Sequence, residues 1–383
     1  MVQILATQKV ATPLSHSWKN DPPAGMFRSS HNLWLDPWLG GLLFLLSGSS
    51  LLVLASAAPH LVEGQLLRFG IAWSLLIIVA HLPPHHLHRW AYLFYGGTVA
   101  LLVAVLLFGI TVKGAQRWLD LGIFRFQPSE LAKLSVPLAV ARWLADGPLP
   151  PNAMRLGVAA LLLLFPLLLI AKQPDLGTAL LVALAGGTVI FFAGLPWRIL
   201  LLLTVFGVAG AYLGWEYLLY DYQRDRILVF LDPYRDPLGK GYHAIQAMIA
   251  VGSGGLFGQG WRHGSQTQLD YLPEPHTDFI FAVVAEEFGF LGAVALASLY
   301  LLIFLRGLLL ALPLRRPFNR ILVASFALTF FLSASINMAM VIGLLPIVGV
   351  PLPWMSYGGT SLLTLACGFG MMMALAGSDR RLL

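Results

Sequence analysis

The sequence predicts an all-α membrane protein that crosses the bilayer about ten times. Hydrophobic residues make up 58% of the 383-residue chain and charged residues only 11%, with a mean hydropathy of +0.77. A water-soluble domain of this size needs a far more polar surface. In addition, apolar segments of about 20 residues, the length at which a helix crosses the hydrocarbon core, recur along the chain.

Short connections separate most of the candidate spans. Nine spans lie at about 37–57, 66–83, 90–110, 155–171, 176–194, 197–218, 279–304, 320–345 and 357–377. A tenth, at about 127–145, is weaker because it carries Glu130 and Lys133. Residues 37–383 are therefore expected to form a single transmembrane domain. Residues 1–36 are polar and lack the apolar core of a signal peptide, so we expect a disordered cytoplasmic lead or a start-site artefact there.

The distribution of basic residues predicts the orientation, because cytoplasmic loops of membrane proteins carry an excess of Lys and Arg. With ten spans both termini share a side, and that side holds most of the basic residues: Lys9, Lys19, Arg28, Arg89, Arg155, Arg198, Arg306, Arg315, Arg316, Arg320, Arg380 and Arg381. The short loops of the other side hold fewer: Arg68, Lys113, Arg117, Arg125 and Lys172. Both termini are therefore predicted to be cytoplasmic, with Asp278 at the outer face.

One outer segment, about 219–278, is much longer than the other connections, and long loops in compact proteins are usually functional. It contains an apolar stretch at 242–251, too short to cross the membrane, and then a glycine cluster from Gly252 to Gly260. Irregular backbone is tolerated at membrane depth only where protein or a water-filled cavity satisfies it. We therefore infer a re-entrant or broken segment lining an outward-facing cavity; a loop on the outer surface is the alternative.

Residues that commonly bind metals form no convincing site in the sequence. His81 and His85 in HLPPHHLHRW are four apart, but Pro83 and Pro84 between them disfavour the continuous helix that would align them. We interpret these side chains as interfacial histidines of a short loop rather than as metal ligands. The single cysteine, Cys367, cannot form an internal disulfide.

Ionisable groups inside apolar spans are costly and by default indicate function. Glu130 and Lys133 in FQPSELAKL are three residues apart, hence on one helical face and able to pair. Gln127 and Ser129 stand at the start of the same helix, with Pro128 suited to its first turn. The pair is either a structural ion pair that ties this helix into the bundle or part of a cavity wall that contacts a polar substrate.

Basic residues on the predicted outer side suit an anion such as a lipid diphosphate. Lys113 and Arg117 run against the positive-inside trend, and Arg117 can bind oxygens in a bidentate way. Trp118 is either an interfacial belt residue or a platform for a sugar or lipid. Arg224 and Lys240 lie in a stretch where basic and acidic residues are interleaved, which on its own is typical of an ordinary solvated loop.

The stretch PEPHTDFIFAVVAEEFGF places Asp278 between a polar loop and an apolar helix. Partial desolvation there tends to raise the pKa of a carboxylate, which favours a role as a general base. Asp is also a common N-cap, here of a helix that begins at Phe279. We give the two roles equal weight, and one residue can perform both. Glu286 and Glu287 lie about 12–14 Å further along that helix, too far to share chemistry with Asp278. We expect them to be buried and bound to neighbouring spans, for example to Lys133; a proton relay is the alternative.

Several longer motifs resemble one known family. KGAQRW, FQPSELAK, QPDLGTA, DPLGKGYHAIQAMIAVGSGGLFGQGW, YLPEPHTDFIFAVVAEEFGFLG and GLLPIVGVPLPWMSYGGTS occur in the order of the signature stretches of the SEDS (shape, elongation, division, sporulation) membrane proteins. The resemblance runs from about residue 37 to the C-terminus. GWRHGSQTQLDYLPE and LLPIVGVPLPWMSYGGTS look most like the RodA-like elongation branch of the family.

The resemblance implies a fold and an activity. The family forms a ten-span helical bundle in the bacterial cytoplasmic membrane, and its members are peptidoglycan glycosyltransferases that polymerise lipid II into glycan strands on the outer side. They work with a class B penicillin-binding protein, which supplies transpeptidation. The expected partners are therefore that transpeptidase, lipid II, the growing strand and membrane lipid, with no nucleic acid.

The resemblance also implies roles for particular residues. The aspartate of HTDF is Asp278, the family's essential catalytic carboxylate. Substrate-binding residues are expected at the positions of KGAxRW and SELAK and at two basic residues of the long outer segment: Lys113, Arg117, Trp118, Glu130, Lys133, Arg224 and Lys240. Supporting residues are expected beside them: Gln127, Ser129, His276, Thr277 and Ser253.

Two other functions remain open from the sequence, a transporter that flips lipid II and a non-catalytic scaffold for the penicillin-binding protein. The unusual polar motifs gather on the predicted outer side, whereas a flippase needs polar groups at several depths. A divalent cation such as Mg²⁺ or Mn²⁺ could assist diphosphate chemistry, but no carboxylate, His or Cys cluster assigns a site.

Overall fold

The computed structural model describes residues 35–112, 115–120, 125–196, 199, 201, 224, 228, 230–237, 239, 241–272 and 274–379. Nine long helices account for most of this part of the chain: α2 (Pro37–Ala57), α3 (Val62–Ala80), α4 (Pro84–Phe108), α5 (Pro128–Ala145), α6 (Ala153–Lys172), α7 (Leu176–Phe192), α12 (Ile280–Ala311), α13 (Pro317–Val341) and α14 (Gly359–Asp379). The shorter elements are the helices η3 (Pro59–Leu61), η4 (Pro233–Arg235), α10 (Tyr242–Ser253) and α11 (Ser265–Gln268), and the strands β1 (Ile110–Val112), β2 (Ala115–Asp120) and β3 (Arg125–Phe126).

The long helices confirm the predicted class of a multi-pass helical membrane protein. Within the described part of the chain, seven helical segments are long and apolar enough to cross a bilayer: α2, η3 with α3, α4, α6, α12, α13 and α14. The apolar helix α7 is shorter, and α5 occupies the predicted weak span at 127–145. The predicted span at about 197–218 lies almost wholly outside the described residues.

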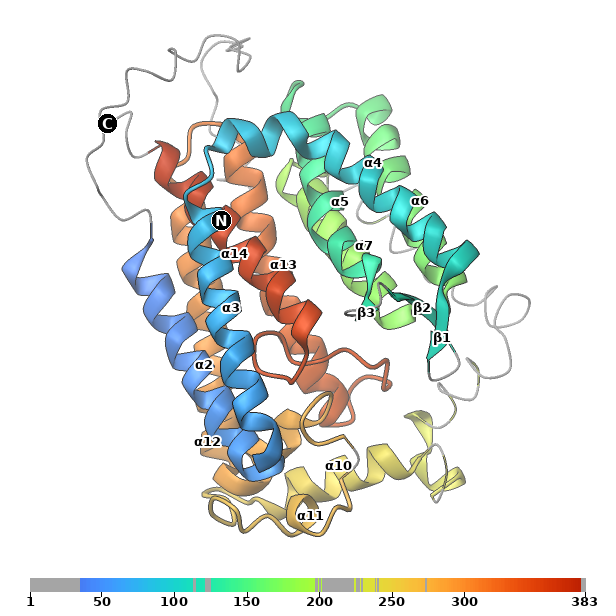
Figure 1. Cartoon of the computed structure of the whole chain (residues 1–383), viewed down its shortest axis with the longest axis vertical. Coiled ribbons are helices and arrows are strands. Elements are labelled where there is room, and N and C mark those ends of the chain that lie inside the picture. Colours follow the sequence, from blue (N-terminus) through green and yellow to red (C-terminus); the bar gives the residue numbers. More distant parts are fainter. Residues whose placement is uncertain are drawn as a thin grey trace.

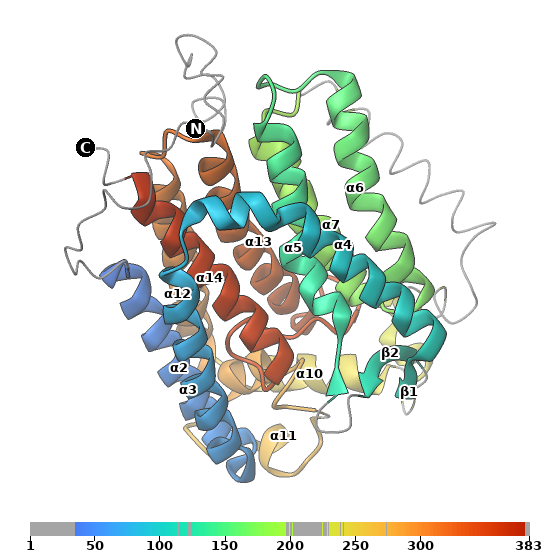
Figure 2. The same cartoon turned by 45° about the horizontal axis from the view of Figure 1, so that its top comes forward.

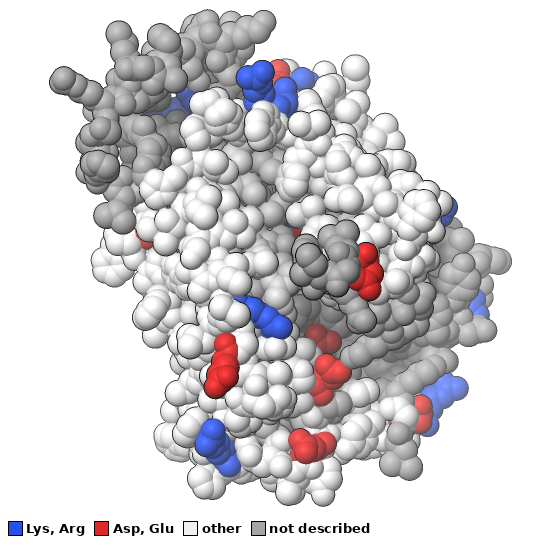
Figure 3. Space-filling model, viewed as in Figure 1, with Lys and Arg blue, Asp and Glu red and all other residues white. Residues whose placement is uncertain are grey.

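The helices form two groups (Figure 1, Figure 2). One contains α2, α3, α12, α13 and α14, and the other contains α4 to α7; α13 joins them by packing against α5 and α7. Helices α10 and α11 lie at one end of the bundle, and α10 runs across that end rather than along the spans. We refer to this end of the bundle as the α10 end. On the face in Figure 3, one group of basic side chains lies at the upper edge, other basic side chains are scattered over the lower half, and the acidic ones lie mostly in the lower half.

A small antiparallel sheet between α4 and α5 was not predicted. Its strand order is β1-β2-β3, with Ile110 opposite Trp118 and Leu119 opposite Phe126. The β-branched run Ile110–Val112 has the strand propensity that the span prediction overlooked. The sheet places residues 115–118 of the KGAQRW motif on β2, which contacts α5.

The first described residues are already part of the fold. Asp36 lies within the range predicted to be disordered, yet it is buried and caps α2 by accepting a hydrogen bond from the Leu39 N–H at 2.9 Å. Both of its carboxylate oxygens also bind Arg306 on α12. The boundary expected at residue 37 is therefore too late, because the fold includes at least Asp36.

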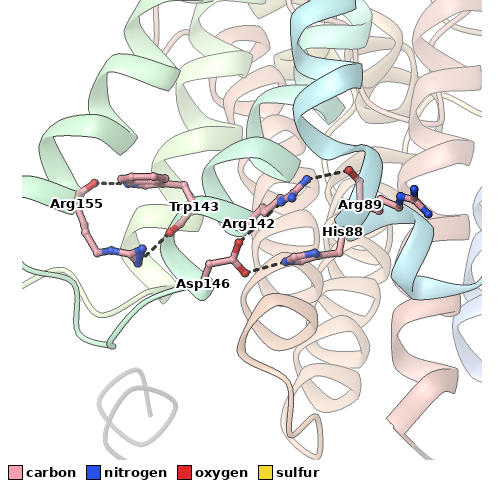
Figure 4. Close-up of polar contacts among 6 residues, drawn as sticks. All are labelled: His88, Arg89, Arg142, Trp143, Asp146 and Arg155. Carbon is pink, nitrogen blue, oxygen red and sulfur yellow. Dashed lines mark hydrogen bonds and ion pairs between the residues drawn. The ribbon is translucent and has the colours of Figure 1, made fainter. Parts of the chain in front are cut away.

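At the end opposite α10, polar side chains join the starts of α4 and α6 to the end of α5 (Figure 4). As predicted, the prolines separate α3, which ends at Ala80, from α4, which begins at Pro84. The contacts are His88 Nε2 to Asp146 Oδ1 at 2.9 Å, Arg142 Nη1 to the Arg89 carbonyl at 2.8 Å, Trp143 Nε1 to the Arg155 carbonyl at 3.0 Å and Arg155 Nη1 to the Trp143 carbonyl at 3.1 Å.

Asp146→Asn should have only a small effect on stability. The Asp146 side chain is 46% exposed, and exposed ion pairs contribute at most about 1 kcal/mol. Arg306→Met should lower the melting temperature in detergent more, because it leaves the buried Asp36 carboxylate without its cation. Equal shifts for the two variants would contradict this ranking.

As predicted, a short helix, α10, ends where the glycine-rich segment begins, and residues 254–260 are not helical; a further break, which was not predicted, lies in α12. Gly289 has φ +66° and ψ −163°, so the helix is interrupted there. Residues 254–260 fold against the break and pair with the backbone groups that it releases. The bonds are Gln259 N to Glu286 O at 3.0 Å, Gly260 N to Glu287 O at 3.0 Å, Phe290 N to Gly255 O at 2.9 Å and Leu291 N to Leu256 O at 3.2 Å.

Candidate active site

The predicted catalytic aspartate lines a small cavity of about 170 Å³. We call it the Asp278 cavity. It is formed by the segment that precedes α12, by the loop between α13 and α14, and by the first turn of α14. Its lining residues are Thr277, Asp278, Pro351, Leu352, Trp354, Ser356, Tyr357, Gly358, Ser361 and Leu362.

Three consecutive carbonyl groups hold the backbone of the HTD motif in place. The His276 carbonyl accepts from the Tyr357 N–H at 2.8 Å and the Thr277 carbonyl from the Ser356 hydroxyl at 2.5 Å. The Asp278 carbonyl accepts from the Asn337 side-chain amide at 2.9 Å. Asn337 is fully buried and also donates to the Val350 carbonyl at 2.7 Å. The position of Asp278 is therefore fixed by residues that lie 59 to 79 positions further along the chain.

The loop that binds this motif is itself anchored in the bundle. The Tyr300 hydroxyl donates to the Pro353 carbonyl at 2.7 Å, and the Ser50 hydroxyl donates to the Met355 carbonyl at 2.7 Å. Trp354 has φ +68°, a strained value for a bulky residue. Its buried indole donates to the Ser47 hydroxyl at 2.9 Å, which holds it in place. Strained residues that the surrounding structure fixes in this way are common at functional sites.

The alternative role for Asp278, a helix N-cap, is wrong. Helix α12 begins at Ile280, its N-cap is Phe279, and no side chain caps it. The carboxylate instead lies near Gly349, where a Cβ atom would be 3.7 Å from Asp278 Oδ2. Gly349 has φ +71°, so glycine suits the backbone conformation there.

A second, mostly apolar cavity lies where the two helix groups meet, and we call it the Lys133 cavity. It shares Pro351 and Ser361 with the Asp278 cavity, so the two adjoin. Its lining comes from α5, α7, α13, α14 and the loop before α14, and includes Leu134, Leu181, Phe326, Phe330 and Phe369. Lys133 on this wall pairs with Glu130, Nζ to Oε2, at 2.6 Å. The predicted pair is therefore present, and its lysine also contacts a cavity.

Arg117 and Gln127, both predicted site residues, meet on a carboxylate that sequence reasoning did not single out. Asp175 is buried at the start of α7 and accepts from the Gln127 amide at 2.9 Å. Arg117 lies 3.6 Å from Asp175 and donates to the Pro174 carbonyl at 2.6 Å. The signal was present in QPDLGTA, where a carboxylate directly precedes an apolar span.

This Asp175 cluster adjoins the Asp278 cavity through one loop. A Cβ atom at Gly177, two residues after Asp175, would lie 2.7 Å from the Val348 carbonyl and 3.3 Å from the Gly349 carbonyl. The QPDLGTA motif therefore packs against the loop that also approaches the Asp278 carboxylate, and Arg117 contacts that motif.

The remaining predicted residues divide into three sets. Lys113 and Lys240 lie outside the described residues, and Arg224 is described without its neighbours along the chain. A second set lies within helices or strands. Trp118 is half-buried in β2, and Ser129 is buried in the first turn of α5. Ser253 donates to the Ala250 carbonyl within α10 at 2.9 Å. His276 and Thr277 precede Asp278 in the chain, and the centre of the His276 ring lies 5.9 Å from that of the Tyr357 ring.

The segment expected to line a cavity does not line either of these two, since no residue of 242–260 is among their lining residues.

Glu286 and Glu287 are buried and hydrogen-bonded, as expected, but the expected partner Lys133 is wrong, because Lys133 pairs with Glu130. Glu286 is fully buried and accepts from the Gln266 N–H at 2.7 Å, the Thr267 N–H at 3.2 Å and the Thr267 hydroxyl at 2.7 Å. Glu287 accepts from the Ser56 hydroxyl and from the Arg262 N–H at 3.2 Å. The two carboxylates thus fasten residues 262–267 and the end of α2 to the first part of α12.

Glu286→Gln should destabilise the protein by about 1–3 kcal/mol, because either orientation of the amide turns an N–H group toward a backbone N–H, that of Gln266 or that of Thr267. Thr267→Val removes the hydroxyl bond alone and should cost about 1 kcal/mol. Melting in detergent measures both effects. If Glu286 were a proton relay, Glu286→Gln would instead lose activity at a temperature where the variant is still fully folded.

The fold and site define a class of protein: a multi-pass helical membrane protein with a carboxylate held in a cavity next to an apolar cavity. The chain belongs to the cell cycle protein family of FtsW, RodA and SpoVE, whose model matches residues 32–381. This confirms the resemblance drawn from the sequence motifs. Among the described residues, no group of three or more His, Cys, Asp or Glu side chains is arranged to hold a metal ion.

Named relatives cover almost the whole chain. It is 47% identical to the peptidoglycan glycosyltransferase MrdB of Escherichia coli over 89% of this chain and 93% of that protein. It is 30% identical to the peptidoglycan glycosyltransferase RodA of Treponema pallidum over 88% and 94%.

Solved structures agree with this family. A chain from work on the coordination of polymerization and crosslinking by a peptidoglycan synthase complex superposes with a TM-score of 0.79 at 37% identity, over 90% of this chain and 98% of that one. The rod shape determining protein RodA of Thermus thermophilus superposes with a TM-score of 0.68 at 32% identity, over 90% and 97%.

Proposed function

We propose that this chain is a peptidoglycan glycosyltransferase of the RodA-like elongation branch, which links lipid II disaccharides into glycan strands. The observation that carries the proposal is the rigid placement of Asp278 in a cavity that adjoins an apolar one. A lipid-linked sugar needs both a polar reaction site and a path for its tail. The names of the relatives support the same activity.

Asp278 acts as the general base in this reaction. It takes the proton from the 4-hydroxyl of the acceptor's N-acetylglucosamine as that oxygen attacks the anomeric carbon of the growing strand's terminal N-acetylmuramic acid. The glycosidic bond forms with inversion, and undecaprenyl diphosphate leaves with the electron pair of the broken bond. The three bonds that hold residues 276–278 keep the base aligned, which is how positioned groups contribute about 10²–10⁴-fold to rate.

The two cavities suit the two parts of the substrate. The Asp278 cavity receives sugar and diphosphate groups, and the phenylalanine- and leucine-lined Lys133 cavity receives the first prenyl units of a tail. Arg117 is engaged by Asp175, so its contribution to the diphosphate is indirect, through the loop at Gly349.

The active site faces the outside of the bacterial cytoplasmic membrane in this proposal, and both termini are cytoplasmic. Arg89, Arg142 and Arg155 at the end opposite α10 support this orientation, because positive charge accumulates on the cytoplasmic side. The partner is a class B penicillin-binding protein. The similarity to a chain of a peptidoglycan synthase complex that couples polymerization to crosslinking supports that partner.

Polymer formation in detergent tests the function against its two alternatives. Purified protein, with and without the penicillin-binding partner, is incubated with purified lipid II and the products are separated by gel. A ladder of glycan strands is the expected result, since no membrane has to be crossed. A flippase would transport lipid II across a vesicle membrane but would form no glycan strands in detergent. A scaffold would form no strands in detergent or in vesicles.

A further inference from the structure

The proposed reaction needs a cation close to Asp278, because the leaving diphosphate gains negative charge as the bond breaks. The described residues that line the Asp278 cavity include no basic residue. Two of the basic residues predicted for this role are held by carboxylates, Arg117 by Asp175 and Lys133 by Glu130. Among the described residues, the cation that meets the diphosphate is therefore expected at the rim of the cavity.

Arg68 on α3 lies at that rim. Its guanidinium carbon is 3.8 Å from the centroid of the Tyr357 ring, and Tyr357 lines the cavity. The stacking fixes the planar guanidinium while leaving its N–H groups available at the edge. Its Nη1 atom is buried and donates no hydrogen bond within the described part of the chain. A buried guanidinium nitrogen in this state is costly unless a ligand supplies an acceptor.

Two glycines lie beside Arg68 and Tyr357. A Cβ atom at Gly359 would lie 3.5 Å from Arg68 Nε, and one at Gly64 would lie 3.3 Å from the Tyr357 hydroxyl. The first turn of α14, which starts at Gly359, lines the same cavity and adds the partial positive charge of a helix N-terminus.

Gln65 provides a second observation. It is fully buried one turn before Arg68 on the same face of α3, and neither of its amide atoms has a hydrogen-bond partner within the described residues. An amide and a guanidinium together offer several N–H donors to one oxygen-rich group. Unsatisfied buried polar groups of this kind are rare in folded proteins.

We propose that Arg68, held on the ring of Tyr357, binds the diphosphate of the lipid-linked substrate at the Asp278 cavity and positions it for departure. This inference rests on the proposed glycosyltransferase function and adds a residue to it. From the sequence, Arg68 is only a basic residue of an outer loop. In the structure it lies in the second turn of α3, beside the HTD and SYGG motifs.

Binding of undecaprenyl diphosphate to the detergent-purified full chain tests the proposal without requiring turnover. Arg68→Met keeps the apolar stem and removes the charge, and it should weaken binding about tenfold to a hundredfold, the range for a lost charged hydrogen bond. Arg68→Lys keeps the charge but loses the planar fork, so a loss of severalfold is expected. Arg155→Met is the matched control, since Arg155 also stacks on an aromatic ring but lies at the opposite end of the bundle.

A second ligand separates the diphosphate from the other anionic groups of the substrate. The soluble disaccharide pentapeptide lacks the lipid and the diphosphate, and its binding should not change in Arg68→Met. Unchanged affinity for undecaprenyl diphosphate in that variant overturns the proposal, as does an equal loss for the soluble headgroup. Should Arg68→Met melt too low to assay, the two ligands are compared on Arg68→Lys, and the same two outcomes overturn the proposal. Failure of the wild type to make strands would instead reject the glycosyltransferase function, whatever the binding result.

Discussion

Asp278→Ala should abolish glycan strand formation from lipid II while leaving the protein folded. The carboxylate lies in a cavity, and it does not cap α12, so its removal breaks no helix terminus. Loss of a general base typically costs about 10²–10⁴-fold in rate, which puts strand formation below detection in a gel assay. Asp278→Asn should be equally inactive, because an amide of the same shape cannot accept the proton.

The control for this variant is Asp270→Asn. Asp270 is an exposed carboxylate in the preceding segment, with φ +57°, a conformation that Asn tolerates well. It should retain wild-type activity and melting temperature. Near-normal strand formation by Asp278→Ala, in a protein that melts like the wild type, would remove Asp278 from the mechanism and favour the scaffold.

Gly289→Ala should prevent the first part of α12 from folding. Gly289 has φ +66° and ψ −163°, a region that only glycine occupies without strain of about 1–3 kcal/mol. A Cβ atom there would also lie 2.3 Å from the Gly258 nitrogen, and backbone cannot move aside as a flexible side chain can. We therefore expect a large fall in melting temperature or little folded protein, and loss of activity because α12 directly follows Asp278.

Gly252→Ala provides the matched comparison. Gly252 lies within α10, has no atom within 4 Å of a built Cβ position and has no positive φ. Alanine is a better helix former, so this variant should be neutral or slightly stabilised. Similar melting temperatures for Gly289→Ala and Gly252→Ala would show that the break in α12 does not depend on glycine.

The sequence was sufficient for the elements whose signal is local. Span length and apolar composition located the long helices, because the bilayer thickness fixes both. Pro83 and Pro84 marked the end of one helix and the start of the next, and the spacing of Glu130 and Lys133 predicted their ion pair. The HTD motif singled out Asp278 as the expected catalytic carboxylate. The family's other motifs singled out Arg117 and Gln127 as expected site residues, but not Asp175, which both of them contact.

Only the tertiary structure decided which distant residues meet. The break at Gly289 depends on residues 254–260 supplying the hydrogen bonds that α12 lacks, and Glu286 and Glu287 bind the nearby loop instead of Lys133. Likewise Asn337, Ser356 and Tyr357 fix the backbone beside Asp278, and Arg68 reaches the same cavity from α3. Hydrophobic periodicity specifies that a segment is buried, but the partner of a buried polar group is set by how the helices pack, which no local pattern contains.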